Sequence, residues 1–182
     1  MLIYLKVWES DLFIKRLYQF ARIINNEHYD WYFKISESSR DRTSNGTRQN
    51  IIRSKIKDRF KIKSPIIYNL LKNTYNTQIR NSIAHSNYSF LNRYIHLNNF
   101  IKSDPFSQNK SITFDEWINI FHSTLILHNL YIGMISAINE RYLEIAKLNG
   151  NVLKIMVTES SGKQYELPLE YHPDSDNWIY KF

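Results

Sequence analysis

Residues 78–90 read QIRNSIAHSNYSF, and three of them carry polar or ionisable side chains that could act together on one substrate: Arg80, Asn81 and His85. Histidine can take a proton from a hydroxyl group, or return one, near neutral pH. Arginine stays protonated and can stabilise negative charge as it builds up on phosphoryl oxygens. Asparagine can orient the histidine or the phosphate by hydrogen bonding.

The spacing of these residues limits how they can meet. On an ideal α-helix, positions five apart are rotated by roughly 140°, so Arg80 and His85 do not share a face, whereas Asn81 and His85 do. Convergence requires the long arginine side chain to reach round the helix, a distorted helix end, or two subunits that each contribute part of the site.

Helical segments must position this motif. Ser64-Pro65 predicts a helix start, with the serine as N-cap and the proline at the first helical position. An apolar stripe then runs into the motif: Ile67, Leu71, Tyr75, Ile79 and Ile83. We therefore expect the motif on or at the end of one packed helix. Periodicity also predicts an amphipathic helix from about Val7 to Ile24.

The positive charge is concentrated in one segment. The net charge is +7, and residues 40–63 hold nine basic residues against two aspartates, so this segment accounts for the whole excess. Apolar residues recur every four positions within it, which predicts a basic amphipathic helix, and such a stripe is typical of RNA-binding surfaces, although a solvated helix face looks the same. The RNA-binding candidates are Arg48, Arg53, Lys55, Lys57, Arg59, Lys61 and Lys63.

The pattern changes after Tyr88. YSFLNRYIHL and NKSITF predict two short strands of a hairpin insert at about residues 89–114. A capping box at Thr113–Glu116 then opens a long helix that is apolar almost all round, which we expect to be buried at the centre of a bundle. Residues 149–182 switch to a period of two and predict a three-stranded antiparallel β-meander, appended to a helical domain of residues 1–148.

Composition excludes several classes of site. The chain has no cysteine, so disulfides, thiolate zinc sites and thiol nucleophiles are excluded. The N-terminal segment interleaves Lys6, Glu9 and Asp11 with apolar residues, unlike a signal peptide, and we find no run of about 18 apolar residues for a membrane span. We expect a cytoplasmic protein with no membrane association, no metal and no cofactor.

The segment IRNSIAHSNY resembles the signature of HEPN domains, an all-helical superfamily whose catalytic members carry Arg-x4–6-His with a polar residue after the arginine. Arg80, Asn81 and His85 occupy these places. The order of elements is similar too, over roughly residues 7–148. The resemblance implies a mainly α, up-and-down helical bundle and a metal-independent endoribonuclease, a hydrolase that acts as a homodimer with both motifs facing one cleft.

The implied roles follow from that resemblance. His85 would be the general acid/base, Arg80 would stabilise the phosphoryl charge, and Asn81 would orient the histidine or the phosphate. The RNA's own 2′-OH would be the nucleophile. Tyr75 and Tyr88 are candidates for lining the cleft. Some family toxins carry a tyrosine two places after the histidine that a partner antitoxin modifies, but here Tyr88 comes one place late.

The superfamily also suggests a toxin–antitoxin or phage-defence role, restrained by an antitoxin or sensor protein that could dock on the β-tail. Two alternatives stay open at this point. One is a non-catalytic HEPN-like module that binds nucleotide, RNA or a partner protein. The other is an oligomerisation domain, in which the basic segment would have no function.

Overall fold

The computed structural model describes residues 1–36, 44–159 and 161–181. These form two compact units. The first comprises residues 1–27 and 33–128, and the second comprises residues 28–32 and 129–182. The division falls inside the long helix of residues 114–148, whereas the change of periodicity had suggested a boundary after residue 148.

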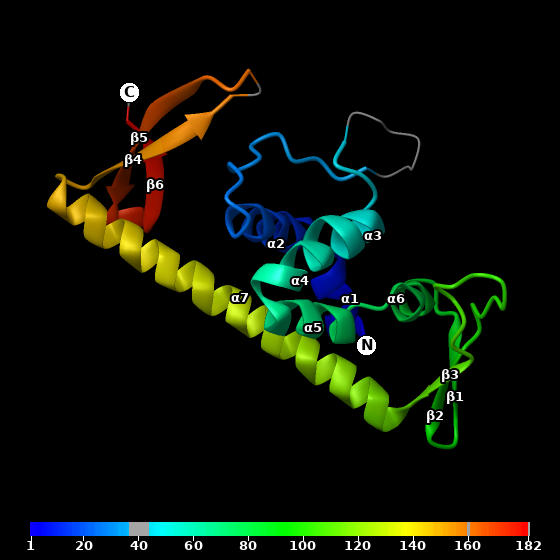
Figure 1. Ribbon diagram of the computed structural model, residues 1–182. Coiled ribbons are helices and arrows are strands. Elements are labelled where there is room, and N and C mark those ends of the chain that lie inside the picture. The colour runs from blue at the N-terminus through cyan, green and yellow to red at the C-terminus, as the bar shows by residue number, and fades with distance from the viewer. Residues whose placement is uncertain (37–43, 160, 182) are drawn as a thin grey trace. The chain divides into compact units, whose positions relative to one another are not determined.

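The described chain is helical in bulk and contains two small three-stranded antiparallel sheets (Figure 1). The helices are α1 (Leu2–Glu9), α2 (Asp11–Ile23), α3 (Arg48–Asn50), the π-helix η1 (Ile51–Lys57), α4 (Asp58–Lys63), α5 (Pro65–Thr74), α6 (Thr77–Ala84), α7 (Phe114–Leu148) and the 3-10 helix η2 (Pro173–Ser175). The strands are β1 (Tyr88–Leu91), β2 (Tyr94–Leu97), β3 (Ser111–Thr113), β4 (Val152–Thr158), β5 (Gln164–His172) and β6 (Asn177–Tyr180).

Ser10 divides the predicted N-terminal helix into α1 and α2. Its backbone is extended, and its Oγ accepts a hydrogen bond from the Phe13 N–H at 3.3 Å. Serine is a strong N-cap residue, so a second helix begins here and the expectation of one helix from Val7 to Ile24 is wrong. The break lets α1 turn away from α2, and α1 still buries Tyr4, Val7 and Trp8.

A second break separates α5 from α6. The chain is extended at Tyr75 and Asn76, and the Asn76 Oδ1 caps α6 by accepting the Ile79 N–H at 3.0 Å. The Tyr4 hydroxyl donates to the Thr74 carbonyl at 3.2 Å and accepts from the Asn76 N–H at 3.4 Å. The backbone groups freed by the break are thereby satisfied, and the expectation of one continuous helix is wrong.

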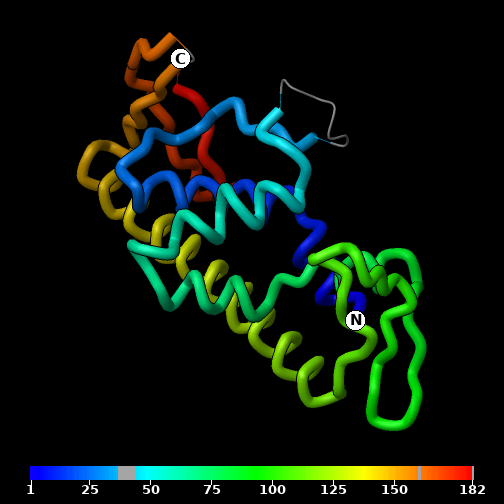
Figure 2. The backbone as a smooth tube through the Cα atoms, turned by 45° about the vertical axis from the view of Figure 1, so that its right-hand side comes forward, coloured from blue at the N-terminus to red at the C-terminus, as the bar shows by residue number. Residues whose placement is uncertain are grey.

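Figure 2 shows the resulting path, in which the chain passes from α5 into α6 close to the N-terminal helix. Ring packing fixes this arrangement. The Trp8 ring lies 4.9 Å from the Tyr75 ring, centroid to centroid, and the Tyr4 ring lies 5.3 Å from that of Trp117. The first helix is therefore packed between the α5–α6 junction and the beginning of α7.

The basic segment is helical from residue 48 to residue 63, as α3, η1 and α4 in succession. Ile52, Ile56 and Phe60 are all buried, so the predicted amphipathic helix is confirmed. Its middle part is a π-helix, a rare form that is frequent at functional sites. Residues 40–42, which belong to the same basic segment, lie outside the described residues.

The insert is a three-stranded sheet with the order β1–β2–β3. The expectation of one strand over YSFLNRYIHL is wrong, because the chain reverses at Asn92, whose φ of 52° is a left-handed conformation that asparagine tolerates. The C-terminal unit contains β4, β5 and β6 as successive antiparallel neighbours, with Ile155 opposite Leu167 and Glu170 opposite Ile179. The predicted meander is confirmed.

The long helix α7 begins as predicted. The Thr113 Oγ1 accepts the Glu116 N–H at 3.1 Å, while the Glu116 carboxylate accepts the Thr113 N–H at 2.7 Å. The expectation that the helix is buried is wrong, because Ile118, Ile126 and Leu130 are among the many exposed apolar side chains along it. A helix of 35 residues is about 52 Å long, too long for short helices to cover.

In length and composition α7 could cross a membrane, because an 18-residue window of it reaches a mean hydropathy of 1.2. The expectation that no segment is apolar enough is wrong by this criterion. It is the one such helix among the described residues. A long core helix of a soluble protein meets the same criterion, so length and composition do not decide between these two environments.

Tyr4→Phe tests the support of the α5–α6 junction. Removing the hydroxyl leaves the Thr74 carbonyl and the Asn76 N–H without their partner, so we expect the free energy of unfolding at pH 7 to fall by about 1–2 kcal/mol. Urea denaturation followed by circular dichroism measures this loss. Tyr165→Phe, at an exposed ring, should change it by less than about 0.5 kcal/mol.

The same variant has a distinct pH dependence. Burial raises the pKa of the Tyr4 hydroxyl above the ordinary value of 10.0. Above that pH the unfolded chain loses this proton while the folded protein keeps it, so the wild type loses stability as pH rises. Tyr4→Phe lacks this contribution. The difference in unfolding free energy between the wild type and Tyr4→Phe should therefore shrink above pH 10. A constant difference would contradict the role assigned to the hydroxyl.

Candidate functional site

Arg80 lies in the middle of α6 and is held on two sides. Its Nη2 forms an ion pair with the Glu9 Oε1, and its Nη1 donates to the Asn81 Oδ1 at 2.7 Å. The arginine side chain is 16% exposed, so the pair is partly shielded from water. The structure therefore brings together two of the three motif residues, with the guanidinium group fixed by a carboxylate from α1.

Glu9 also binds a second arginine. Its Oε2 lies 3.0 Å from the Arg48 Nη1, and the Arg48 Nη2 lies 2.6 Å from the Asp11 Oδ1. Two arginines and two carboxylates form one network that ties α1 and α2 to α3 and α6. Arg48, predicted to bind RNA, is thus occupied by carboxylates within its own chain.

His85 follows the last residue of α6, and its backbone (φ −106°, ψ 10°) departs from helical geometry. Its N–H donates to the Asn81 carbonyl at 3.0 Å, which keeps the residue attached to the helix end. The imidazole is exposed, and within the described residues no side chain forms a hydrogen bond or ion pair with it. Arg80 and His85 are therefore not joined within a single chain.

The other predicted RNA-binding residues are distributed rather than aligned. Arg59 pairs with Glu27, and the Lys57 Nζ lies 3.2 Å from the Asp58 Oδ1. Arg53 turns toward the start of α6. The remaining lysines of the segment have no ion-pair partner in the part of the chain that the structure describes: Lys55, Lys61 and Lys63.

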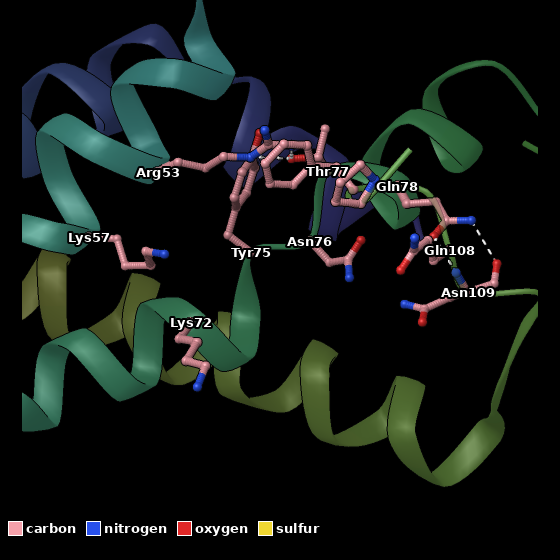
Figure 3. Close-up of a pocket in the computed structure, with 11 residues that line it drawn as sticks. Arg53, Lys57, Lys72, Tyr75, Asn76, Thr77, Gln78, Gln108 and Asn109 are labelled. Carbon is pink, nitrogen blue, oxygen red and sulfur yellow. Dashed lines mark hydrogen bonds between the residues drawn. The ribbon is translucent and has the colours of Figure 1, made fainter. Parts of the chain in front are cut away.

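A cleft of about 290 Å³ opens beside the α5–α6 junction (Figure 3). Basic side chains from η1 and α5 face amide side chains of the loop between β2 and β3 across it. Its lining consists of Arg53, Lys57, Lys72, Tyr75, Asn76, Thr77, Gln78, Pro105, Phe106, Gln108 and Asn109. No carboxylate is among these lining residues. The cleft is therefore a basic and amide-rich depression at the start of the helix that carries Arg80.

Arg53 is the most constrained cation of the cleft. Its Nε donates to the Thr77 Oγ1 at 3.0 Å, its Nη2 bonds to the same oxygen, and its guanidinium carbon lies 3.8 Å from the Phe106 ring centroid. The last contact is a cation–π interaction. Burial raises the pKa of the neighbouring Tyr75 hydroxyl, with a hydrogen bond to Thr77 acting against the shift. Both side chains are thus positioned before any ligand arrives.

The two tyrosines proposed for the cleft have different surroundings. Tyr75 lines it, whereas Tyr88 lies in β1 with its ring 5.6 Å from that of Phe90. Sequence reasoning missed Lys72 and Asn76, because each looks like an ordinary helix residue until the chain breaks after Thr74. The signal that could have revealed the break is the residue type at position 76. Asparagine is a preferred N-cap residue, and here it lies within an apolar stripe that looks continuous.

The chain matches no known protein family, and no curated protein or solved structure matches it. Two features of the described residues indicate a function. One is the basic cleft at the start of α6, and the other is the exposed imidazole at its end.

Glu9→Gln tests the network around Arg80. The change leaves the guanidinium group of Arg80 partly buried without its countercharge, so we expect a loss of about 1–3 kcal/mol of unfolding free energy, between the values for exposed and buried pairs. Glu144→Gln breaks the exposed Arg141–Glu144 pair and should cost less than about 0.5 kcal/mol. If Glu9→Gln and Glu144→Gln lowered the unfolding free energy equally, in thermal and in urea denaturation, the Glu9 network would have no special structural role.

Proposed function

We propose that the protein is a metal-independent endoribonuclease of the HEPN type that acts as a homodimer in the cytoplasm. The observation that carries the proposal is the exposed imidazole of His85, uncommitted within the described residues, at the end of a helix whose start lines a basic cleft. RNA is the polyanion that this combination suits, because its 2′-OH supplies a nucleophile within the substrate.

The proposed chemistry uses the residues in distinct roles. The 2′-oxygen attacks the adjacent phosphorus, the bond from phosphorus to the 5′-oxygen breaks, and a 2′,3′-cyclic phosphate and a 5′-hydroxyl result. His85 removes the proton from the 2′-OH or supplies one to the leaving 5′-oxygen. Arg80 stabilises the negative charge on the phosphoryl oxygens, and Asn81 holds the guanidinium group through the bond at 2.7 Å.

A second copy of the chain is part of the proposal. Arg80 and His85 are not joined within one chain, so a complete site requires His85 and Arg80 from two subunits, or a rearrangement on binding. The exposed apolar side chains of α7, such as Ile126 and Leu130, support the dimer, because a large exposed apolar surface is typical of an interface.

The direct test is cleavage of a labelled, structured RNA in EDTA, with analysis of the product ends. We expect wild-type protein to produce 2′,3′-cyclic phosphate and 5′-hydroxyl ends. His85→Ala and Arg80→Ala should each reduce the rate at least about 100-fold, because general acid–base catalysis and charge stabilisation each contribute on that order. His172→Ala, at an exposed histidine of β5, is the matched control and should retain full activity.

A second candidate function is RNA or nucleotide binding without catalysis. The observation that favours it is the Glu9–Arg80 ion pair, which already neutralises the proposed catalytic arginine. Under this alternative, all the proteins of the cleavage assay are equally inert but retard RNA on a gel. The retardation should weaken as salt rises, since phosphate contacts release counterions. That result would replace the nuclease with the binding module.

Ile126→Glu tests the dimer. Placing a charge on this exposed apolar position of α7, which is 55% exposed, should convert a particle of about twice 21.9 kDa into a monomer, measured by light scattering after gel filtration. The monomer should also lose RNA cleavage if the site is composite. Ile179→Glu, at a residue 46% exposed in β6, should leave both the mass and the activity unchanged. A wild-type monomer that cleaves RNA would contradict the composite site.

A further inference from the structure

The cleft at the start of α6 has an excess of positive charge. Arg53 and Lys57 reach it from η1, and Lys72 reaches it from the last turn of α5. The residues at positions 53 and 57 are four apart and so lie on the same side of their helix. Three cations from two helices therefore line one opening, and an anion is the ligand whose charge suits them.

Carboxylates near the cleft offset only part of this charge. Asp58 forms an ion pair with Lys57, with 3.2 Å between its Oδ1 and the Lys57 Nζ, but it does not line the cleft. Asp104 accepts the Phe106 N–H at 2.9 Å, and this bond, followed by one from Ser107 and the charge of Arg53, holds the pKa of that carboxyl below its usual range. Asp104 does not line the cleft either.

Lys72 makes no ion pair with any residue that the structure describes. It is also exposed, so its ammonium group can turn toward a ligand without leaving a partner behind. This makes it the freest cation of the cleft, and the position at which a substitution should least disturb the fold.

The walls of the cleft are suited to a base as well as to a phosphate. The Asn76 Oδ1 accepts the Ile79 N–H, and Asn109 bonds through its backbone to Gln78. Among the residues that the structure describes, neither the Asn76 NH₂ group nor the side-chain amide of Asn109 has a hydrogen-bond partner. Amides of this kind pair with base edges, and the rings of Tyr75 and Phe106 offer surfaces for stacking.

The cleft is also held in shape. The Gln78 side chain is buried and makes two hydrogen bonds to the backbone of Asn109, at 2.7 and 3.0 Å, while the Asn99 Nδ2 donates to the Gln78 carbonyl at 3.0 Å. The loop that carries the amide wall is thereby fixed to α6. A preformed site loses less entropy on binding, and a volume of about 290 Å³ lies at the lower end for small-molecule sites, well above the size of a bare phosphate ion.

We propose that this cleft is a subsite for one phosphate-bearing ribonucleotide. Arg53, Lys57 and Lys72 bind its phosphate, and the amides of Asn76 and Asn109 bind its base. The inference rests on the proposed function in one respect, because it names where the RNA is held. Thr77 and His85 are eight residues apart, about 12 Å along a helix axis, so the nucleotide in the cleft lies beside the scissile bond and not at it.

The ribonucleotide can come from an RNA strand or from a free mononucleotide, and the test separates the two. Binding of AMP, inorganic phosphate, adenosine and a 2′-O-methyl RNA hexanucleotide, which cannot be cut by 2′-OH attack, is measured by calorimetry with the full chain. We expect phosphate and adenosine alone to bind at least about tenfold more weakly than AMP or the hexanucleotide. Phosphate lacks the contacts to the base, and adenosine lacks the contacts to the phosphate.

Variants of the cleft decide the outcome. Lys72→Gln should weaken binding about tenfold, the loss of one charge-assisted contact. Asp104→Asn keeps the oxygen that accepts the Phe106 N–H but removes a negative charge near Arg53, so it should tighten binding. Lys163→Gln, at an exposed lysine outside both the cleft and the basic segment, should leave binding unchanged.

Each result has one meaning. AMP binding that Lys72→Gln weakens supports a free nucleotide as the source. Binding of the hexanucleotide but not of AMP, weakened in the same way by Lys72→Gln, supports an RNA strand. Binding of neither probe, or binding that Lys72→Gln and Lys163→Gln weaken equally, overturns the subsite. The cleavage assay remains separate, because loss of cleavage in His85→Ala concerns the nuclease, whereas Lys72→Gln concerns the cleft.

Discussion

The attachment of α1 to α6 is the constraint on which the candidate site depends. Tyr4 satisfies the backbone on both sides of the α5–α6 break through one hydroxyl group. One turn and a half later on α1, Glu9 binds the guanidinium group of Arg80. The Trp8 ring packs on that of Tyr75 between them. Because these contacts hold α6 at its start and its middle, the basic cleft and the exposed histidine are fixed relative to each other.

In the proposed function, binding and chemistry belong to opposite ends of a single short helix. The start of α6 faces a cleft with three cations, and a helix N-terminus itself favours negative charge. The end of α6 presents an imidazole to solvent. An RNA strand that lies along the helix would therefore meet a phosphate-binding region first and a proton-transfer group afterwards. Arg80 stands between them, with its charge shared with Glu9.

Much of the local structure could be predicted from the sequence, because local signals decide it. Pro65 begins α5, Thr113 and Glu116 cap α7, and the alternation after residue 150 becomes a three-stranded sheet. The expected bundle did not include the breaks at Ser10 and Asn76. Both residues are good N-caps within apolar stripes. Whether the chain continues as one helix or breaks at the cap depends on a distant partner, which is Tyr4 for the break at Asn76.

The sequence indicated which residues could form a candidate site, but not how those residues are arranged. The spacing of Arg80 and His85 indicated that the two would not share a face, and the structure leaves them unjoined within the chain. Charge counting could not anticipate that Arg48 and Arg59 would be occupied by Glu9 and Glu27, because these partners lie more than 30 residues away in the sequence. The exposure of α7 could not be anticipated either, because the part of a long helix that is covered depends on the lengths of all the other helices.

The most direct test of the central claim is a crystal structure of the protein with a 2′-O-methyl RNA tetranucleotide. We predict one phosphate group bonded to Arg53 and Lys72 in the cleft, and an adjacent phosphodiester whose 2′-oxygen lies against the imidazole of His85, from the same subunit or its partner. A strand bound on another surface, with the cleft empty and His85 facing solvent, would contradict it.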